Sequence, residues 1–131
     1  MTNRRTISTT SPYEELFGFC RAVRTGNSIH IAGTAPIGDD GHTVGVSDPE
    51  AQARRCFRIA QQSLEKLGGS LRHVIRTRMF LTRMSDWEVI GRVHGEFFRD
   101  VRPVSTMVEV SGLIDADWLI EIEMDAIIDD A

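Results

Sequence analysis

The sequence predicts a single α+β domain covering residues 1–131, with its elements in the order β-β-α-β-α-β-β. Two segments repeat apolar residues every three or four positions and open with helix-capping residues, which is the pattern of amphipathic helices. Five shorter segments alternate apolar and polar residues, which is typical of strands. From this order we expect both helices to pack on one face of a mixed sheet.

The first two strands are predicted as a hairpin at residues 19–24 and 28–32. The turn between them contains Gly26 and Asn27, which both tolerate a positive φ. Residues 1–12 show no hydrophobic periodicity and are therefore predicted to form a flexible arm.

Both helices carry start signals. Residues 47–50, Ser-Asp-Pro-Glu, offer a cap, a proline in the first turn and a capping-box glutamate, and Gly68-Gly69 marks the end of this helix. Its apolar stripe comprises Ala53, Cys56, Phe57, Ala60, Leu64 and Leu67. Residues 85–88, Ser-Asp-Trp-Glu, give the second helix another capping box, and Arg102-Pro103 lies beyond its end.

The remaining strands are predicted at residues 72–81, 104–110 and 118–128. Along the last two, side chains alternate between an apolar face and a face that mixes polar and apolar groups. Such a mixed face suggests cover by a second subunit rather than by bulk solvent.

Composition narrows the function classes. The formal net charge is −4 and the sequence pI about 5.5, so the chain lacks the basic surface typical of nucleic-acid binding. Cys20 and Cys56 are too few for a disulfide framework, and no Cys/His spacing predicts a metal site. No segment approaches the roughly 18 apolar residues of a membrane helix, and we see no secretory signal. We expect a cytoplasmic protein without metal or cofactor.

Acidic residues of the last strand are candidates for chemistry. Glu123 and Asp125 share a face with Glu121, and Arg76, on the strand predicted at residues 72–81, is expected to form cross-strand ion pairs with the first two. Glu121 lies between two isoleucines, and a carboxylate in a partly apolar cleft has a raised pKa and can transfer protons near neutral pH. His94, on the second helix, is interpreted as a structural residue.

Several motifs, in a fixed order from residue 19 to residue 128, resemble those of the YjgF/RidA family of reactive-intermediate deaminases, also called endoribonuclease L-PSP proteins. The motifs are Arg21-Ala22-Val23, Ile31-Ala32-Gly33-Thr34, the helix leading to Gly68-Gly69, residues 74–80, and the pair 102–110 and 119–123. The resemblance implies a chorismate-mutase-like fold and a homotrimer whose clefts are each lined by two subunits. It also implies hydrolysis of 2-imino or 2-enamino acids to ammonia and a 2-oxo acid.

The resemblance assigns the glutamate that activates water to Glu121. The arginine that clamps the substrate carboxylate in these deaminases falls on Ser105, which is neutral. A neighbouring arginine, Arg78 in preference to Arg21, is therefore expected to supply a cation, or the substrate lacks a carboxylate. The other expected ligand-binding positions are Phe19 in place of a tyrosine, Ala32 in place of a serine, Met107 in place of a frequent cysteine, and Gly33 and Thr34, whose amides and hydroxyl either face a ligand or form a simple turn.

Three functions follow as hypotheses. The first is a small-molecule hydrolase that acts on an imine, enamine or related C–N compound and uses Glu121. The second is a non-catalytic trimer that binds a metabolite in the same cleft, which the neutral Ser105 and the hydroxyl-free Phe19 favour. The third is an endoribonuclease, against which the acidic charge balance argues.

Overall fold

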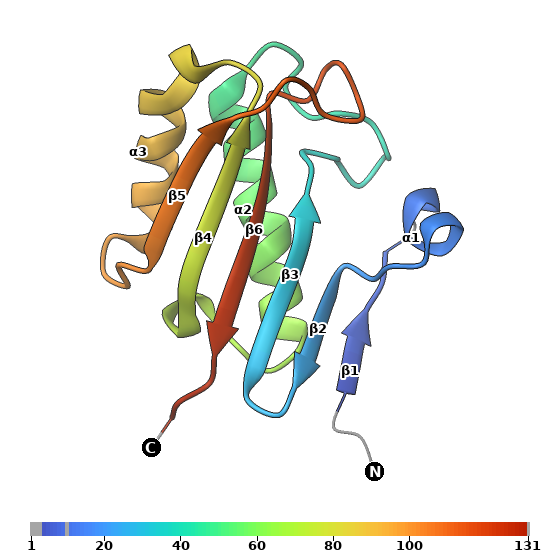
Figure 1. Cartoon of the computed structure of the whole chain (residues 1–131), viewed down its shortest axis with the longest axis vertical. Coiled ribbons are helices and arrows are strands. Elements are labelled where there is room, and N and C mark those ends of the chain that lie inside the picture. Colours follow the sequence, from blue (N-terminus) through green and yellow to red (C-terminus); the bar gives the residue numbers. More distant parts are fainter. Residues whose placement is uncertain (1–3, 10, 131) are drawn as a thin grey trace.

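In the computed structural model, which describes residues 4–9 and 11–130, one six-stranded sheet has the order β1-β2-β3-β6-β4-β5 (Figure 1). Its strands are β1 (Arg4–Ile7), β2 (Ala22–Thr25), β3 (Ser28–Thr34), β4 (Val74–Leu81), β5 (Val104–Glu109) and β6 (Ile120–Ile127). The helices are α1 (Pro12–Phe17), α2 (Pro49–Lys66) and α3 (Trp87–Phe98). β4 and β5 pair in parallel and the other neighbours antiparallel, which confirms the α+β class with a mixed sheet.

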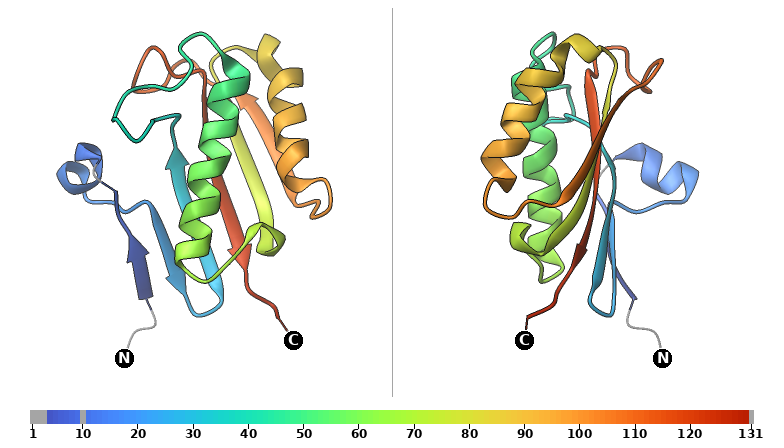
Figure 2. Two further views of the ribbon diagram at one scale, coloured as in Figure 1. Left: turned by 180° about the vertical axis from the view of Figure 1, so that it is seen from behind. Right: turned by 60° about the vertical axis from the view of Figure 1, so that its left-hand side comes forward.

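Helices α2 and α3 cover one face of the sheet, as predicted, whereas α1 stands off the opposite side (Figure 2). The core between the helices and the sheet includes the fully buried side chains of Phe57, Leu64, Ile120, Ile122 and Met124. Because side chains alternate along a strand, the residues between Ile120, Ile122 and Met124 on β6 face away from the helices. This second face, called the open face below, carries Glu121, Glu123 and Asp125.

The prediction of a flexible N-terminal arm is wrong for the residues that the structure describes. Residues 4–7 form β1, which pairs antiparallel with β2, and α1 begins at Pro12; residues 1–3 and 10 of that arm lie outside the described residues. The sequence hides β1 because it is an edge strand with mostly exposed side chains, so no apolar alternation marks it. The next strand begins at Ala22 rather than at residue 19, since Gly18, at φ 76°, ends α1.

Both helices start slightly later than their capping boxes predicted. Asp48 caps α2 by accepting a hydrogen bond from the Ala51 amide, so the box between residues 47 and 50 is not formed. A short 3₁₀ turn, Met84–Asp86, precedes α3, and the Asp86 carboxylate accepts from Arg83 instead of capping the helix. The boundaries of the other predicted elements differ from the observed ones by at most two residues.

Residues 4–9 and 11–130 contain no helix long and apolar enough to cross a lipid bilayer.

Candidate functional site

Glu121 lies directly against the backbone of Gly33. The register of β3 on β6 shifts between Ile31 and Thr34, and this irregularity brings Gly33 beneath the Glu121 side chain. A Cβ atom built on Gly33 would lie 2.3 Å from Glu121 Oε1. The absence of a side chain at residue 33 is therefore what makes room for the carboxylate.

The environment of Glu121 favours its protonated form. Burial raises the pKa of this carboxyl above its ordinary value, the Arg21 guanidinium opposes the rise, and the negative charge of Glu123 adds to it. Glu121 is half-buried on the open face. A partly desolvated carboxyl with a raised pKa is the kind of group that can accept and return a proton near neutral pH.

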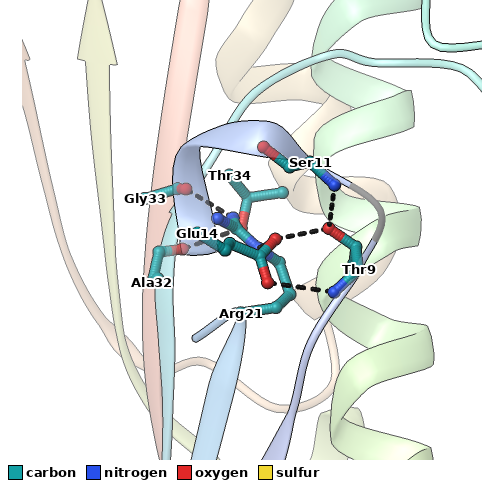
Figure 3. Close-up of polar contacts among 7 residues, drawn as sticks. All are labelled: Thr9, Ser11, Glu14, Arg21, Ala32, Gly33 and Thr34. Atoms are coloured by element: carbon teal, nitrogen blue, oxygen red, sulfur yellow. Dashed lines mark hydrogen bonds and ion pairs between the residues drawn. The ribbon is translucent and has the colours of Figure 1, made fainter. Parts of the chain in front are cut away.

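Arg21 is almost fully buried, and its guanidinium contacts other groups of the same protein. Its Nη1 donates to the Gly33 carbonyl and, at 3.1 Å, to Thr34 Oγ1, while its Nε lies 3.7 Å from a Glu14 carboxylate oxygen (Figure 3). Arg21 thus supports the Gly33 backbone on which Glu121 rests. The suggestion that Arg21 reaches out to clamp a ligand carboxylate does not fit these contacts.

Glu14 fastens the N-terminal segment to this end of the sheet. It is buried in α1, and its carboxylate accepts from the Thr9 amide at 2.9 Å and from the Thr9 hydroxyl (Figure 3). Sequence reasoning misses Glu14 because it predicts no element between the arm at residues 1–12 and the strand at residues 19–24. A signal was available, since Ser11-Pro12-Tyr13-Glu14 has the S-x-x-E spacing of a helix start.

The other positions predicted near Gly33 are only partly accessible. Phe19 is exposed, and the Arg21 Cζ lies 6.0 Å from its ring centroid. Ala32 is half-buried, and its amide donates to the Arg21 carbonyl. Thr34 is buried, and its hydroxyl accepts from Arg21 and donates to the Ala32 carbonyl. Of the predicted contacts here, the Phe19 ring therefore offers the most free surface.

Arg78 lies on the open face and is ion-paired there. Its Nη1 lies 3.1 Å from a Glu123 carboxylate oxygen and 3.3 Å from one of Asp125. The Asp125 carboxylate also lies 2.7 Å from His30 Nδ1. The predicted cross-strand ion pairs thus form, but with Arg78, which lies directly opposite Glu123, rather than with Arg76.

Ser105 and Met107 lie on the helix-facing side of β5, away from the open face. The Thr77 hydroxyl, fully buried on β4, donates to Ser105 Oγ at 2.8 Å, and Met107 packs partly buried against the core. Within one chain, Ser105 and Glu121 are therefore on opposite faces of the same sheet. The structure brings together Gly33 and Glu121, and separates them from Ser105 and Met107.

His94 is hydrogen-bonded and packed by aromatic rings. Its Nε2 lies 2.8 Å from Thr77 Oγ1, and its ring centroid lies 4.7 Å from that of Phe98 and 5.6 Å from that of Phe57. Burial lowers the pKa of His94 below its ordinary value. The side chain thus fills the structural place predicted for it, and it also belongs to a polar chain that reaches Ser105.

Two open hollows lie on the helix side of the molecule. One, of about 250 Å³, is lined by Arg54, Arg58, Gln61, Leu71, Glu96 and Phe97. The other, of about 290 Å³, is lined by His94, Gly95, Phe98, Arg99, Arg102 and Pro103. Glu121 borders neither. Over residues 4–9 and 11–130, no three or more His, Cys, Asp or Glu side chains are grouped to hold a metal ion.

Relatives with known names match most of the chain. The family model described as Endoribonuclease L-PSP matches residues 10–128. An uncharacterised protein of Streptomyces coelicolor is 38% identical over 122 residues, which are 93% of this chain and 90% of that protein. The 3-aminoacrylate deaminase RutC of Acinetobacter baylyi is 34% identical over 101 residues, which are 77% of this chain and 79% of that protein.

Solved structures agree. Rv2704 of Mycobacterium tuberculosis, described as a member of the YjgF/YER057c/UK114 family, superposes with a TM-score of 0.87 at 39% identity, covering 96% of this chain and all of that one. The YjgF gene product of E. coli superposes with a TM-score of 0.82 at 26% identity, covering 95% and 98%. The chain therefore belongs to the endoribonuclease L-PSP family, the YjgF/RidA group of small α+β proteins.

Proposed function

We propose that this chain is a small-molecule hydrolase that cleaves an imine, an enamine or a related C–N compound, with Glu121 activating the water. The observation that carries the proposal is the environment of Glu121, whose carboxylate is half-buried, has a raised pKa and lies against Gly33. The relative from Acinetobacter baylyi is named for a deaminase reaction on 3-aminoacrylate, which supports the same reaction class for this chain.

The chemistry needs one carboxylate and no redox partner. The Glu121 carboxylate accepts a proton from water as the water oxygen adds to the imine carbon, and it returns that proton to the nitrogen, which gives a neutral carbinolamine. Glu121 then accepts the proton of the carbinolamine hydroxyl and passes it to the nitrogen as the C–N bond breaks, so that ammonia leaves and the hydroxyl oxygen becomes the carbonyl oxygen. One imine and one water thus give one carbonyl compound and one ammonia, and Glu121 returns to its starting charge.

The proposed site lies between two copies of the chain, in a homotrimer. Glu121 and Ser105 lie on opposite faces of one sheet, so a cleft that uses both must draw them from different copies. Two exposed apolar patches support such contacts. The α1 patch, at the β1 edge, consists of Leu16, Phe17 and Phe19, and the β5 patch, at the other edge, consists of Val104 and Val108. Patches that differ in this way associate head to tail, and head-to-tail contacts can close into rings.

The assembly is tested by light scattering. Wild-type chain is expected as a trimer, and Val108→Lys, which places a charge in the β5 patch, is expected to shift it toward monomers. Arg92→Gln, a change on the exposed face of α3, serves as the control and should leave the trimer intact. A wild-type chain that remains a stable monomer would contradict the proposed cleft.

The activity is tested by ammonia release from a panel of small imines and enamines. General acid–base catalysis contributes about 10²- to 10⁴-fold, so Glu121→Gln should lower the rate by roughly that factor. The matched control is Glu96→Gln, the same isosteric change at an exposed residue of α3 that is paired with Arg54. Equal rates for wild type and Glu121→Gln would remove Glu121 from the reaction.

A second candidate is a metabolite-binding trimer without turnover. It is favoured because the polar groups near Glu121 are already hydrogen-bonded within the protein. Arg21 donates to the Gly33 carbonyl, and the Thr34 hydroxyl accepts from Arg21 and donates to the Ala32 carbonyl. Thermal stabilisation by a metabolite together with no ammonia release would support this candidate. An endoribonuclease is disfavoured by the net charge of −4, and tight, steeply salt-dependent RNA binding would be the result that revives it.

A further inference from the structure

A chain of three polar side chains crosses the sheet edge between α3 and β5. His94 Nε2 lies 2.8 Å from Thr77 Oγ1, and Thr77 Oγ1 lies 2.8 Å from Ser105 Oγ. Thr77 is fully buried, His94 is half-buried, and Ser105 is exposed on the edge strand β5. Of these three hydrogen-bonded side chains, Ser105 is thus the one that an incoming molecule can contact.

The protons shared by these three side chains can be counted. A threonine hydroxyl has one proton, so when Thr77 donates to Ser105 it must accept from His94, which then carries its proton on Nε2. In that arrangement the proton of Ser105 is free to be donated outward. Thr77 and His94 therefore fix the Ser105 hydroxyl in place and leave it a hydrogen-bond donor toward a ligand.

The three hydrogen-bonded side chains of His94, Thr77 and Ser105 carry no charge at neutral pH. Burial lowers the pKa of His94, so the imidazole is neutral at pH 7. Arg78 follows Thr77 on β4 and therefore lies on the open face, away from Ser105. It is ion-paired there with Glu123 and Asp125. A ligand group at Ser105 therefore meets a neutral donor rather than a guanidinium.

We propose that Ser105, held by Thr77 and His94, is a specificity-determining residue that receives an uncharged polar group of the ligand, such as a carbonyl or amide oxygen, rather than a carboxylate. The inference rests on the proposed function, because it places Ser105 in the cleft that Glu121 enters from the neighbouring copy. One neutral hydroxyl satisfies one lone pair of a carbonyl oxygen, whereas a carboxylate taken from water requires several donors or a cation.

The competing arrangement uses the two arginines at the end of α3. Arg99 and Arg102 line the hollow of about 290 Å³ that His94 also borders. The Arg99 guanidinium lies over Gly95, 3.6 Å from the position of a Cβ there, and Arg102 Nε donates to the Arg99 carbonyl. A carboxylate that did bind on this side of the sheet would use these cations, so they define the alternative outcome.

The test compares an acid with its amide, 2-oxobutanoate with 2-oxobutanamide, by NMR titration of the full-length chain. A net hydrogen bond of about 1 kcal/mol corresponds to roughly fivefold in affinity, so wild type should bind the amide about fivefold or more tighter than the acid. Ser105→Arg should reverse the preference, because it introduces a cation. Thr77→Val keeps the side-chain shape and removes the hydroxyl, and should bring the ratio near one, while the control Glu96→Gln should leave it unchanged.

A second measurement needs no ligand. The ¹⁵N shifts of the His94 ring should indicate the tautomer with its proton on Nε2, and they should change in both Thr77→Val and Ser105→Ala. Ring shifts that stay at the wild-type values in Ser105→Ala would break the link between His94 and Ser105 and overturn the inference.

Two ligand results would also overturn it. One is a wild type that prefers the acid, with the preference lost in Arg102→Gln, and the other is an amide that does not bind. These outcomes are separable from the fate of the proposed function. Hydrolysis that depends on Glu121 but favours acids would refute the inference alone, whereas an amide preference without any effect of Glu121→Gln on ammonia release would refute the hydrolase alone.

Discussion

Two regions of this sheet treat polar groups in opposite ways. At the Glu121 region, a carboxylate is partly desolvated beside Gly33, and Arg21, which is itself paired with the buried Glu14, partly opposes the rise of its pKa. At the Ser105 region, on the other face, a buried hydroxyl links two groups without net charge at neutral pH. The comparison teaches that the first region is built to hold and move a proton, and the second to orient a neutral contact.

The two regions also depend on different parts of the chain. The Glu121 region needs the N-terminal segment, because Glu14 of α1 is the carboxylate that faces Arg21. The Ser105 region needs only β4, β5 and α3. Disturbing α1 should therefore affect one region and spare the other, and this is the main way to test the comparison.

Arg21→Met should have the largest effect. Removing one partner of a buried charge pair leaves the other charge uncompensated, which destabilises proteins by about 3–5 kcal/mol. Here the lone group is the Glu14 carboxylate, which is almost fully buried. Urea denaturation of the variant should show a loss in this range, while the ¹⁵N shifts of His94 in the folded protein should stay at their wild-type values.

A double variant serves as the control for this prediction. Glu14→Gln combined with Arg21→Met removes both charges, so it should recover part of the stability that Arg21→Met loses. Losses that simply add would show that the two side chains do not interact, and would sever the N-terminal segment from the Glu121 region.

Gly33→Ala should have the next largest effect. The added methyl would lie 2.3 Å from Glu121 Oε1, so the carboxylate must move. Because Glu121 Oε1 ends a flexible side chain that can turn aside, the cost in stability should be about 1 kcal/mol, at the low end for overpacking, and the main loss is expected in ammonia release. Gly91→Ala is the matched control, because a Cβ there meets nothing within 4 Å and alanine suits a helix interior. A Gly33→Ala protein with wild-type stability and activity would contradict the contact.

Most of the fold could be predicted from the sequence because its signals are local. The spacing of apolar residues in residues 49–66 and 87–98 identifies the two long helices, and alternation along residues 120–127 places Glu121 on the face away from the core. β1 was missed for a physical reason. It is held by backbone pairing with β2 and buries little, so its sequence carries no hydrophobic pattern.

The candidate site was only partly predictable, since its contacts join residues distant in sequence. Glu121 was identified from its flanking isoleucines, but its contact with Gly33 depends on the register shift of β3 on β6. The sequence shows Arg21 as a candidate cation, yet no local sequence pattern indicates that it forms an ion pair with Glu14. Likewise, the bond from Ser105 to Thr77 follows from the parallel pairing of β4 and β5, which the strand pattern alone leaves open.

The pH dependence of stability should distinguish Glu121 from ordinary carboxyls. Its pKa is raised above the ordinary 4.5, so the folded state holds the proton more tightly than the unfolded chain does. The contribution of Glu121 to stability is therefore complete below pH 4.5 and declines as the pH rises through the raised pKa. Urea denaturation across this window should show wild type losing stability relative to Glu121→Gln, with the difference levelling off at higher pH.

The same titration sharpens the role of Arg21. Because its positive charge opposes the rise, the pKa of Glu121 in folded Arg21→Met should move further up, which ¹³C NMR of the carboxyl can follow. A pKa that moves down in this variant would mean that Arg21 acts on Glu121 mainly through the backbone of Gly33 rather than through its charge.

Arg78→Gln should have the smallest effect. Its ion pairs with Glu123 and Asp125 are on the open face and partly exposed, and exposed ion pairs contribute about 0–1 kcal/mol. Arg78 touches neither Gly33 nor Ser105, so the preference between 2-oxobutanamide and 2-oxobutanoate should also stay unchanged. A shift of that preference, measured by the same NMR titration, would show that Arg78 supplies a cation to the ligand after all and that the two regions are not electrically separate.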